Sequence, residues 1–360
     1  MVQFTRFCGV SMSCHLLNST DTVIPTKVVN SVKVRYLSVV EKVLVPLATF
    51  QSPLFYSVCR GAKVAENCGG ISVFVSQDTM TRSVILKCKS CNEAMSISEN
   101  IINDKCIKDI IEEGSQYTKF VDVSNEIVGN LLYVRLCIES GEASGHNMVT
   151  KAAQNFVDFI TAKYDCECMS VSGNVCVDKK VSAINSICGR GKRVNAEIVI
   201  HRDVCKSLLR TTPEKICELN TAKNLLGSNL AGSLRSANAH FANMLLAVYL
   251  ATGQDVANIV EGSQGITYAN LQNDGSLYFS VYLPNIIVGT IGNGKHIEFA
   301  RKNLEMMGCL NDGGSKRLSA IIGATVLCGE LSLMAALTNN GELIKSHLSI
   351  ERSKNAKYRY

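Results

Sequence analysis

Two adjacent lysines beside an aspartate, Asp178-Lys179-Lys180, are the residues of this sequence best suited to chemistry on an anion. Ser172 and Asn174 come just before them. A cationic pair of this kind suits a site that stabilises negative charge. The run directly follows the last expected strand of a small unit, so it crosses between two units, where ligand sites concentrate. An ordinary solvated loop is the alternative interpretation of the same run.

A second group of polar residues lies within the long, mostly apolar stretch 221–252. Its apolar residues occur all round a helix, which predicts one long helix buried on most sides. A buried helix holds charged and amide side chains only where they have partners. His240 and Asn243 stand three residues apart and share a face of such a helix. With Lys223, they predict either a ligand site or a satisfied structural network.

Two further runs have backbone suited to phosphate. Residues 289–294 (GTIGNG) follow an expected strand and precede an expected helix, although their spacing is not that of the dinucleotide fingerprint. Residues 142–148 (EASGHNM) open another helix, whose first turn could receive a pyrophosphate. Capping of an ordinary helix by Asn147 explains that second run equally well. His347, near the end of the chain, is either structural or a mobile acid.

The elements that must hold these residues form two units. Residues 83–169 have the pattern strand, helix, two strands, helix and strand, which is the βαββαβ order of the split ferredoxin-like arrangement. The remainder alternates strands and helices, including an expected helix at 315–337. We therefore expect an α+β fold. Its parts are a large domain (1–82 and 170–345) built around the long central helix at 221–252, an inserted ferredoxin-like small domain (83–169), and a C-terminal segment (346–360).

Composition narrows the class of protein. The chain has 360 residues, 46% hydrophobic and 19% charged, which is typical of a globular protein. Its net charge of +6 is scattered, without an aromatic-interleaved basic stripe, so we expect no nucleic-acid partner. Neither a signal peptide nor a continuous apolar stretch of ~20 residues is present, which predicts a cytoplasmic protein with reduced cysteines and no membrane span. Cys88 and Cys91 have zinc-like spacing without a second pair, so we expect no metal.

Taken together, these runs make the chain resemble the hydroxymethylglutaryl-CoA reductase family. The resemblance extends from about residue 45 to about residue 354, and the ending after Lys345 is similar to the eukaryote-like class, with this chain a divergent member. It implies reduction of hydroxymethylglutaryl-CoA to mevalonate and free CoA by two hydride transfers from NADPH. It also implies a homodimer or a dimer of dimers with active sites shared between subunits. The densest matches are 78–82 (DTMTR), 172–192, 223–255 (KNLLGS…NAHFAN…TGQD), 289–294 and 329–354 (GELSLMAAL…KSHLSIERSK).

The resemblance implies roles for individual residues. Lys179 matches the catalytic lysine that stabilises oxyanion character at the reacting carbonyl, and Asp255 matches its supporting carboxylate. His347 matches the general acid that protonates the departing CoA thiolate. The positions expected to bind substrate are Arg60, Arg82, Ser172, Asp178, Lys180, Arg210, Lys223, His240 and Asn243. The positions expected to bind the cofactor are Lys63, Ser115, Glu142, Ser144, Gly145, His146, Asn147, Gly289, Gly292 and Gly294.

The sequence departs from the family at residues that carry chemistry. The family's catalytic glutamate, which follows the Val-Pro-Leu-Ala-Thr run, is Gln51 here, and an amide cannot donate a carboxylic acid proton. Loss of a general acid typically costs ~10²–10⁴ in rate. Ser144 and His146 stand where the family has methionines, Glu142 replaces an aspartate, and Gln116 replaces a basic residue. Three interpretations follow: a slow reductase, a non-catalytic homologue that binds CoA ligands or an active partner subunit, and a reductase for another acyl-CoA.

Overall fold

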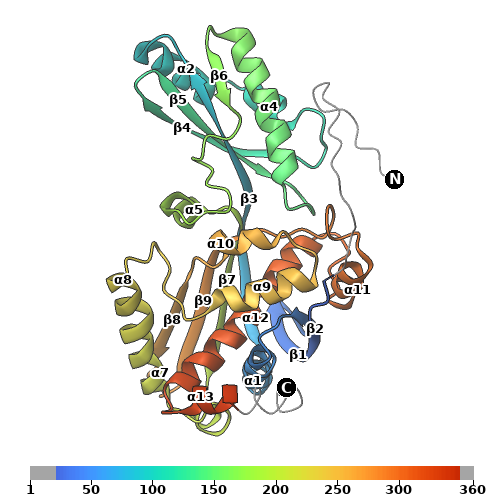
Figure 1. Cartoon of the computed structure of the whole chain (residues 1–360), viewed down its shortest axis with the longest axis vertical. Coiled ribbons are helices and arrows are strands. Elements are labelled where there is room, and N and C mark those ends of the chain that lie inside the picture. The colour runs from blue at the N-terminus through green and yellow to red at the C-terminus, as the bar shows by residue number, and fades with distance from the viewer. Residues whose placement is uncertain (1–21, 349–360) are drawn as a thin grey trace, which may run out of the picture.

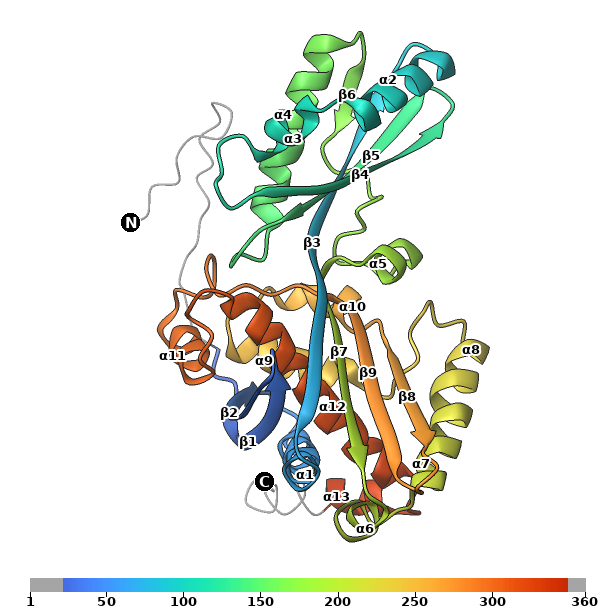
Figure 2. The same cartoon turned by 180° about the vertical axis from the view of Figure 1, so that it is seen from behind.

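The computed structural model describes residues 22–348 of the chain. It has two bodies, one above the other in Figure 1, and a single long strand, β3 (Ile71–Lys87), runs through both (Figures 1 and 2). The first part of β3 pairs with β7 (Gly191–Ile200), and the second part pairs with β5 (Leu131–Glu139). Because this backbone is continuous, β3 fixes how the two bodies are placed.

The lower body contains a sheet with helices packed on one face. Its strands follow the order β2-β1-β3-β7-β9-β8, and all neighbours are antiparallel except β1 and β3. Alternation along β9 explains this packing: Leu277, Phe279 and Val281 are buried, and the side chains between them are only partly buried. The opposite face of the sheet lies open toward the viewer in Figure 2. The other strands are β1 (Thr26–Tyr36), β2 (Val39–Ala48), β8 (Ile266–Leu271) and β9 (Leu277–Ile286).

The long helix at the centre of the lower body is α12 (Gly314–Leu337), which confirms the helix expected at 315–337. It contacts α1 (Pro53–Asn67), α9 (Phe241–Ala251) and the sheet. Helix α1 comes so near that a Cβ on Gly61 would lie 2.2 Å from the carbonyl oxygen of Cys328. By length and composition α12 could also cross a membrane. However, 89% of its apolar 18-residue stretch is buried in the protein, as in the core helix of a folded domain.

The prediction of one long helix at 221–252 is wrong. The chain forms a π-helical stretch, η2 (Asn220–Gly227), then the single turn α8 (Ser228–Leu230), and reaches α9 through an irregular segment. Within that segment Gly232 and Arg235 have left-handed φ values of +70° and +49°, which no right-handed helix accommodates. The physical reason is the glycine- and serine-rich run near residues 227–236, whose low helix propensity breaks the pattern.

The upper body has a second sheet, with strands in the order β4-β5-β3-β6 and every neighbour antiparallel. Helix α4 places Val149, Phe156 and Ile160 in the hydrophobic cluster that this sheet helps to form. The single helix expected between the first two strands of residues 83–169 is two helices, α2 and α3, because the chain turns at Asp104. The elements are β4 (Lys119–Val128), β6 (Glu167–Ser170), α2 (Cys91–Asn103), α3 (Cys106–Glu112) and α4 (His146–Lys163).

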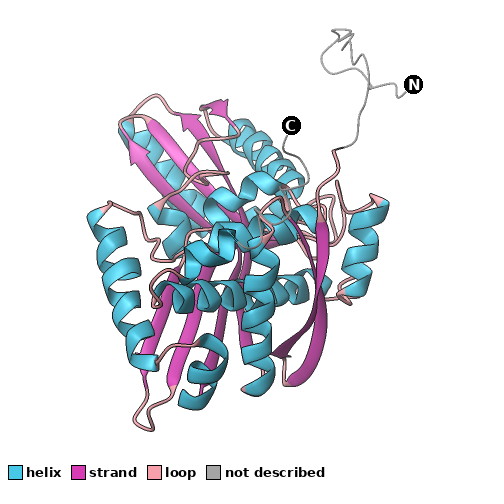
Figure 3. Cartoon of the chain, turned by 60° about the horizontal axis from the view of Figure 1, so that its bottom comes forward, coloured by secondary structure: helices cyan, strands magenta, loops and turns pink. Residues whose placement is uncertain are grey.

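Short helices connect the larger elements of the lower body. Figure 3, coloured by type of element, shows the helices gathered in front of the strands of the lower sheet. The remaining helices are α5 (Ala183–Cys188), α6 (Arg202–Val204), η1 (Cys205–Leu209), α7 (Pro213–Leu219), η3 (Val256–Asn258), α10 (Ile259–Gly262), α11 (Glu298–Met306) and α13 (Glu342–His347).

Candidate active site

The crossover loop, residues 171–182, returns the chain from β6 to the lower body and has a strained backbone. Asn174, Val177 and Lys179 have φ values of +60°, +44° and +55°, a region that non-glycine residues rarely adopt. Each such residue costs of order 1–3 kcal/mol and persists only where its surroundings hold it. Strain of this kind concentrates at functional sites, so the loop is the first place to look for chemistry.

Hydrogen bonds from neighbouring elements hold the crossover loop in this conformation. Ser83 Oγ, on β3, accepts hydrogen bonds from the N–H groups of Val175 and Cys176 at 3.0 and 3.2 Å. Asn185 Nδ2, on α5, donates to the carbonyl oxygen of Val177 at 2.8 Å. The loop is thereby tied to the shared strand and to the lower body at once, which fixes the direction of the lysine that follows.

Lys179 forms an ion pair with Asp255. Its Nζ lies 2.6 Å from Asp255 Oδ2, and Asp255 itself caps η3 by accepting from the N–H of Ala257 at 3.2 Å. The hydrogen bond to Asp255 raises the pKa of Lys179. Burial pushes the pKa of Asp255 upward, but the hydrogen bond and charge of Lys179 outweigh it and leave that pKa lowered. Both groups are therefore charged at neutral pH, and Lys179 is a fixed cation beside open space.

A buried ion network supports this pair from behind. Arg190 lies 2.8 Å from Asp178 Oδ1 and 2.8 Å from Glu261 Oε1, and Arg190 and Glu261 are almost fully buried. The same Glu261 oxygen accepts a hydrogen bond from the backbone N–H of Lys179 at 3.1 Å. Burial raises the pKa of Glu261 to about 7, although Arg190 opposes the rise. We call Asp178, Lys179, Arg190, Asp255 and Glu261 the Lys179 centre.

Two more titratable groups face the Lys179 centre. His146, the first residue of α4, has its Nε2 3.7 Å from Asp178 Oδ1. Burial and the charge of Arg190 lower the pKa of His146, although Asp178 opposes them. Lys295 directly follows the 289–294 loop and is only 7% exposed. Burial lowers the pKa of Lys295 and the charge of Asp255 opposes the change, so a second ammonium group lies near the centre.

The two runs expected to bind phosphate lie against each other. The N–H of Thr290 donates to the carbonyl oxygen of Glu142 at 2.8 Å, and a Cβ on Gly289 would lie 2.5 Å from the nitrogen of Ser144. Only glycine permits that approach. Gly145, in a left-handed conformation with φ +90°, then starts α4 without a side-chain cap. The first N–H groups of this 18-residue helix are thus free of capping side chains and suit a phosphate.

A pocket of about 300 Å³ continues from the start of α4. Its lining includes Ser115, Asn147 and Lys151, so hydroxyl, amide and ammonium groups border it. The carboxylate of Glu113 lines the pocket too, so the lining is mixed in charge. The hydroxyl, amide and ammonium groups beside the open helix start suit a phosphate. The carboxylate of Glu142 has another role, because it accepts hydrogen bonds from the N–H groups of Gly313 and Ser315 at the start of α12.

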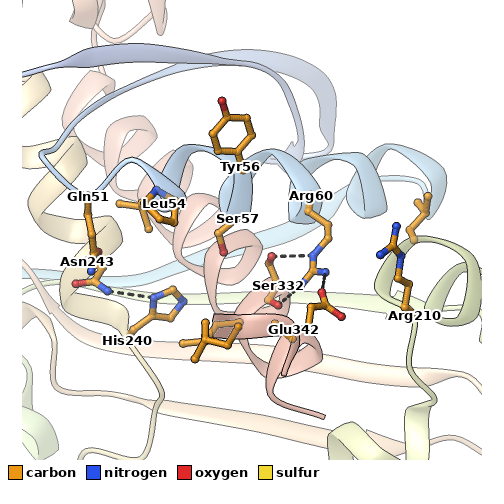
Figure 4. A pocket seen from close by; sticks show the side chains of 15 residues that line it. Gln51, Leu54, Tyr56, Ser57, Arg60, Arg210, His240, Asn243, Ser332 and Glu342 are labelled. Carbon is orange, nitrogen blue, oxygen red and sulfur yellow. Dashed lines mark hydrogen bonds and ion pairs between the residues drawn. The ribbon is translucent and has the colours of Figure 1, made fainter. Parts of the chain in front are cut away.

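A second pocket, of about 480 Å³, lies beside α1 and the start of α9. Figure 4 shows Gln51 and Asn243 pointing toward each other at one end, with Arg210 at the other. His240 Nδ1 lies 3.3 Å from Asn243 Nδ2, and its Nε2 lies 2.9 Å from the carbonyl oxygen of Gly329. We call this the Gln51 pocket; it brings together five residues that the sequence had marked, Gln51, Arg60, Arg210, His240 and Asn243.

Arg60 is already occupied in the Gln51 pocket. Its Nε donates to Ser332 Oγ at 3.0 Å, and its guanidinium pairs with Glu342 Oε1 at 2.6 Å (Figure 4). Glu342 begins α13, so this pair fastens α13 over α1. His347 is the last residue of α13, and its side chain lies outside the described part of the structure, as do residues 349–360 of the expected C-terminal segment.

The Lys179 centre and the Gln51 pocket lie at opposite ends of α9. His240 precedes the first residue of the helix, and Asp255 follows its last turn. A helix of 11 residues is about 16 Å long. One chain therefore presents two separate groups of predicted site residues. Five other predicted positions lie outside both groups. Arg82 donates a hydrogen bond to Thr150 Oγ1, and Lys180 Nζ lies 3.3 Å from the carbonyl oxygen of Asp178. The other three are exposed: Lys63, Ser172 and Lys223.

Sequence reasoning missed several residues that build the site. Glu261 and Lys295 were not marked, although each is a charged residue within an apolar or glycine-rich run. Charged residues are rarely buried unless they are paired, so the sequence alone could have marked Glu261 and Lys295 as candidate site residues. Ser83 gave no signal, because its role depends on the loop that returns to it much later in the chain. In residues 22–348 no cluster of three or more His, Cys, Asp or Glu side chains could hold a metal ion.

The chain is similar to known proteins over most of its length. The family profile described as hydroxymethylglutaryl-coenzyme A reductase matches residues 19–352. A 3-hydroxy-3-methylglutaryl-coenzyme A reductase of Methanocaldococcus jannaschii is 42% identical over 315 residues, which cover 86% of this chain and 77% of the relative. The reductase of Camptotheca acuminata is 39% identical over 322 residues, covering 86% of this chain and 54% of the plant protein.

The fold has a similar solved structure. A class II 3-hydroxy-3-methylglutaryl-CoA reductase from Streptococcus pneumoniae, bound to NADPH in open conformations, aligns with a TM-score of 0.73. The alignment covers 89% of this chain and 86% of that chain at 18% sequence identity. At that identity the similarity shows the mixed α+β fold alone.

Proposed function

Because the chain belongs to the hydroxymethylglutaryl-coenzyme A reductase family, we propose that it reduces hydroxymethylglutaryl-CoA to mevalonate and free CoA with NADPH. The relatives make it an oxidoreductase of the mevalonate pathway, which leads to isoprenoids and sterols. The observation that carries the proposal is the Lys179–Asp255 pair at 2.6 Å, on a strained loop held by buried charges. Such a preorganised cation is what reduction of a thioester carbonyl requires.

The chain's own residues supply charge stabilisation and positioning. Reduction of a thioester to an alcohol needs two hydrides, which NADPH supplies when bound. Lys179 stabilises the negative charge that develops on the carbonyl oxygen, an effect worth about 3–4 kcal/mol in comparable sites. Asp255 holds the ammonium group in place, and the Arg190–Glu261 pair holds the loop. We assign His347 to protonating the CoA thiolate that leaves after the first hydride transfer.

We assign the cofactor to the upper body. The uncapped start of α4, the glycine loop 289–294 and the pocket with Ser115, Asn147 and Lys151 support this assignment. A similar solved structure carries NADPH. We further propose that residues 83–169 form the inserted ferredoxin-like domain, since their strand order β4-β5-β3-β6 is compatible with that arrangement. The eukaryote-like class and a cytoplasmic location remain predictions from the sequence.

We propose that active sites are shared between two copies of the chain, in a homodimer or a dimer of dimers. In one chain the Lys179 centre and the Gln51 pocket are separated by the length of α9. The hydroxymethylglutaryl group is shorter than that helix, so one chain cannot surround it with both groups. A second copy that brings its Gln51 pocket to the Lys179 centre resolves this geometry. Sedimentation of the full chain, with a monomer as the contradicting result, tests the proposal.

NADPH consumption by the purified chain with hydroxymethylglutaryl-CoA tests the activity directly. We expect turnover that falls ~10²–10³-fold in Lys179→Ala, because a fixed oxyanion cation is lost. Lys302→Ala is the matched control, since Lys302 is an exposed lysine of α11 that pairs with Glu298. Turnover no higher than in Lys179→Ala would reject the reductase and favour the second candidate, a non-catalytic homologue that binds CoA ligands or an active partner. That second candidate is favoured by Gln51, which stands where the family has its catalytic glutamate.

A further inference from the structure

The proposed reaction requires a proton that Gln51 cannot supply. After the first hydride transfer and loss of CoA, the remaining group is an aldehyde. Its reduction adds a hydride to the carbon and a proton to the oxygen, so an acid must stand at that oxygen. The amide of Gln51 has no acidic proton to give. The carboxylate of Glu342, which also lines the Gln51 pocket, is already paired with Arg60 at 2.6 Å.

Most groups of the Lys179 centre are equally unsuited to donate this proton. Asp255 has a lowered pKa and is ionised, while the raised pKa of Lys179 keeps the proton on its ammonium group. Arg190 does not lose a proton in proteins. Glu261 has a pKa raised to about 7, but its side chain is fully buried behind Arg190 and the backbone of Lys179. None of these four groups combines an available proton with access to the substrate.

His146 differs from these four groups in having an unpartnered ring nitrogen and a partly exposed ring. Its Nε2 lies 3.7 Å from Asp178 Oδ1, and within residues 22–348 this buried nitrogen has no hydrogen-bond partner. The side chain as a whole is 19% exposed, so part of the ring borders open space. Its other nitrogen, Nδ1, lies 3.4 Å from Ser144 Oγ. An imidazole with a free nitrogen beside a fixed cation is an unexpected feature unless a ligand completes it.

The backbone fixes His146 at this point. Gly145 precedes it with φ +90°, and a Cβ there would lie 2.7 Å from Ser140 Oγ and 2.9 Å from Met80 Cβ. The carbonyl oxygen of His146 accepts a hydrogen bond from Thr150 Oγ1 at 2.8 Å, inside the first turn of α4. The ring therefore projects from a rigid helix start that also borders the proposed cofactor site.

We propose that His146 is the acid that protonates the aldehyde oxygen in the second reduction, in place of the glutamate that Gln51 replaces. Hydride from the reduced nicotinamide adds to the carbonyl carbon, and the C=O π electrons take the proton from imidazolium Nε2. The products are the alcohol, the oxidised cofactor and neutral His146, which regains its proton from water. This inference rests on the proposed function, because it needs the aldehyde and the bound cofactor.

The charges around His146 determine the expected pH dependence. Asp178 and Asp255 favour the imidazolium, whereas burial, Arg190 and Lys179 oppose it, and the sum leaves the pKa of His146 lowered. An acid catalyst works only in its protonated form, so the rate falls as pH rises through this pKa. The second reduction is therefore fastest on the acid side of neutrality.

The test uses the full chain and four variants: His146→Met, Gln51→Glu, the double variant, and His201→Met as control. His201 is exposed and lies in the turn after β7, outside both site groups. With the aldehyde of mevalonate and NADPH, we expect His146→Met to lower kcat ~10²-fold and to abolish the acid-side rise. Gln51→Glu in the same chain should restore kcat to within ~10-fold of the unaltered protein, because a carboxylic acid then returns.

The outcomes separate this inference from the proposed function. If the unaltered chain reduces hydroxymethylglutaryl-CoA while His146→Met matches it in kcat and pH profile, the inference alone is wrong. If His146→Met raises only the KM for NADPH, His146 binds the cofactor and the inference is again wrong. If the unaltered chain reduces neither the thioester nor the aldehyde, the proposed function fails and the inference falls with it. Loss of kcat with rescue by Gln51→Glu supports both.

Discussion

The two ends of α9 carry two different kinds of site. At one end the Lys179 centre joins the fully buried Arg190–Glu261 pair to Asp178, Lys179 and Asp255, which are 25–41% exposed. Its pairs lie at 2.6–2.8 Å and it is attached to a strained loop. At the other end the Gln51 pocket is open, and its charged pair, Arg60 with Glu342, remains about one-fifth exposed. The first region therefore contains a fully buried ion pair, whereas the charged pair of the second region is partly exposed.

This difference matches what each region has to do. A cation that stabilises a transition state must be in place before the charge develops, since reorganisation at that moment would raise the barrier. A region that admits a long, phosphate-bearing thioester must open and close around it. The buried charges behind Lys179 serve the first requirement. The partly exposed Arg60–Glu342 pair and the α13 segment that it fastens fit the second.

Removing Arg190 is the largest test of this comparison. Arg190→Met leaves Asp178 and Glu261 without their shared cation in a buried setting, so we expect unfolding free energy to fall by about 3–5 kcal/mol. Arg60→Met, in a pair that is about one-fifth exposed, should cost only about 1 kcal/mol. Chemical denaturation of both variants measures the difference. Equal losses would contradict the claim that only the Lys179 centre is organised by buried charge.

The raised pKa of Glu261 makes the stability of the Lys179 centre depend on pH. Its pKa rises from 4.5 to about 7 on folding, because burial disfavours the carboxylate. The folded state thus binds more protons than the unfolded state between these values. The contribution of Glu261 to the free energy of unfolding is fully present below its pKa in the unfolded state. It is lost as pH rises through the pKa of the folded state, with a slope of at most about 1.4 kcal/mol per pH unit.

Denaturation of the unaltered chain and Glu261→Gln across pH 4.5–7 checks this slope. The amide does not titrate, so the variant should lose the downward trend that this residue adds. Glu298→Gln, at an exposed pair on α11, is the control and should keep the trend. If the two variants have the same pH profile, the buried carboxyl does not titrate in this window.

The difference between the two regions also explains which site residues could be predicted from the sequence and which could not. Lys179 and Asp255 could be found because a run of charges stands out from its surroundings, and the resemblance supplied their roles. Their support could not be assigned, since Ser83 bonds to the crossover loop and Glu261 pairs with Arg190 only when distant segments fold together. Apolar content alone predicted the wrong central helix, because composition does not show that a glycine- and serine-rich run will break it.

Restoring the acid of the Gln51 pocket should have a smaller effect than breaking the Lys179 centre. Gln51→Glu adds a carboxyl beside Asn243 in a chain where we already assign the proton to His146. We therefore expect kcat with hydroxymethylglutaryl-CoA to rise by less than ~10-fold, far below the full value of a general acid. Steady-state rates with saturating NADPH measure it. A rise of ~10²-fold or more would show that the unaltered chain lacks a working acid.

The smallest expected effect concerns the pair that closes the Gln51 pocket. Glu342 neutralises Arg60, so a phosphate-bearing ligand must displace a carboxylate to reach that guanidinium. Glu342→Gln removes the competing charge, and we expect the KM for hydroxymethylglutaryl-CoA to fall about two- to threefold, within the range of a partly exposed pair. The value of kcat should stay the same, because neither residue touches the Lys179 centre.

Salt sharpens this last measurement, because exposed pairs are screened and buried ones are not. The advantage of Glu342→Gln in KM should shrink as ionic strength rises, while the loss caused by Arg190→Met should persist. A matched change on the other side of α1, Glu66→Gln, removes an exposed carboxylate that pairs with Lys42 and should leave KM unchanged. If Glu342→Gln raises KM instead, the pair holds Arg60 ready for the ligand, and the pocket is more organised than its exposure suggests.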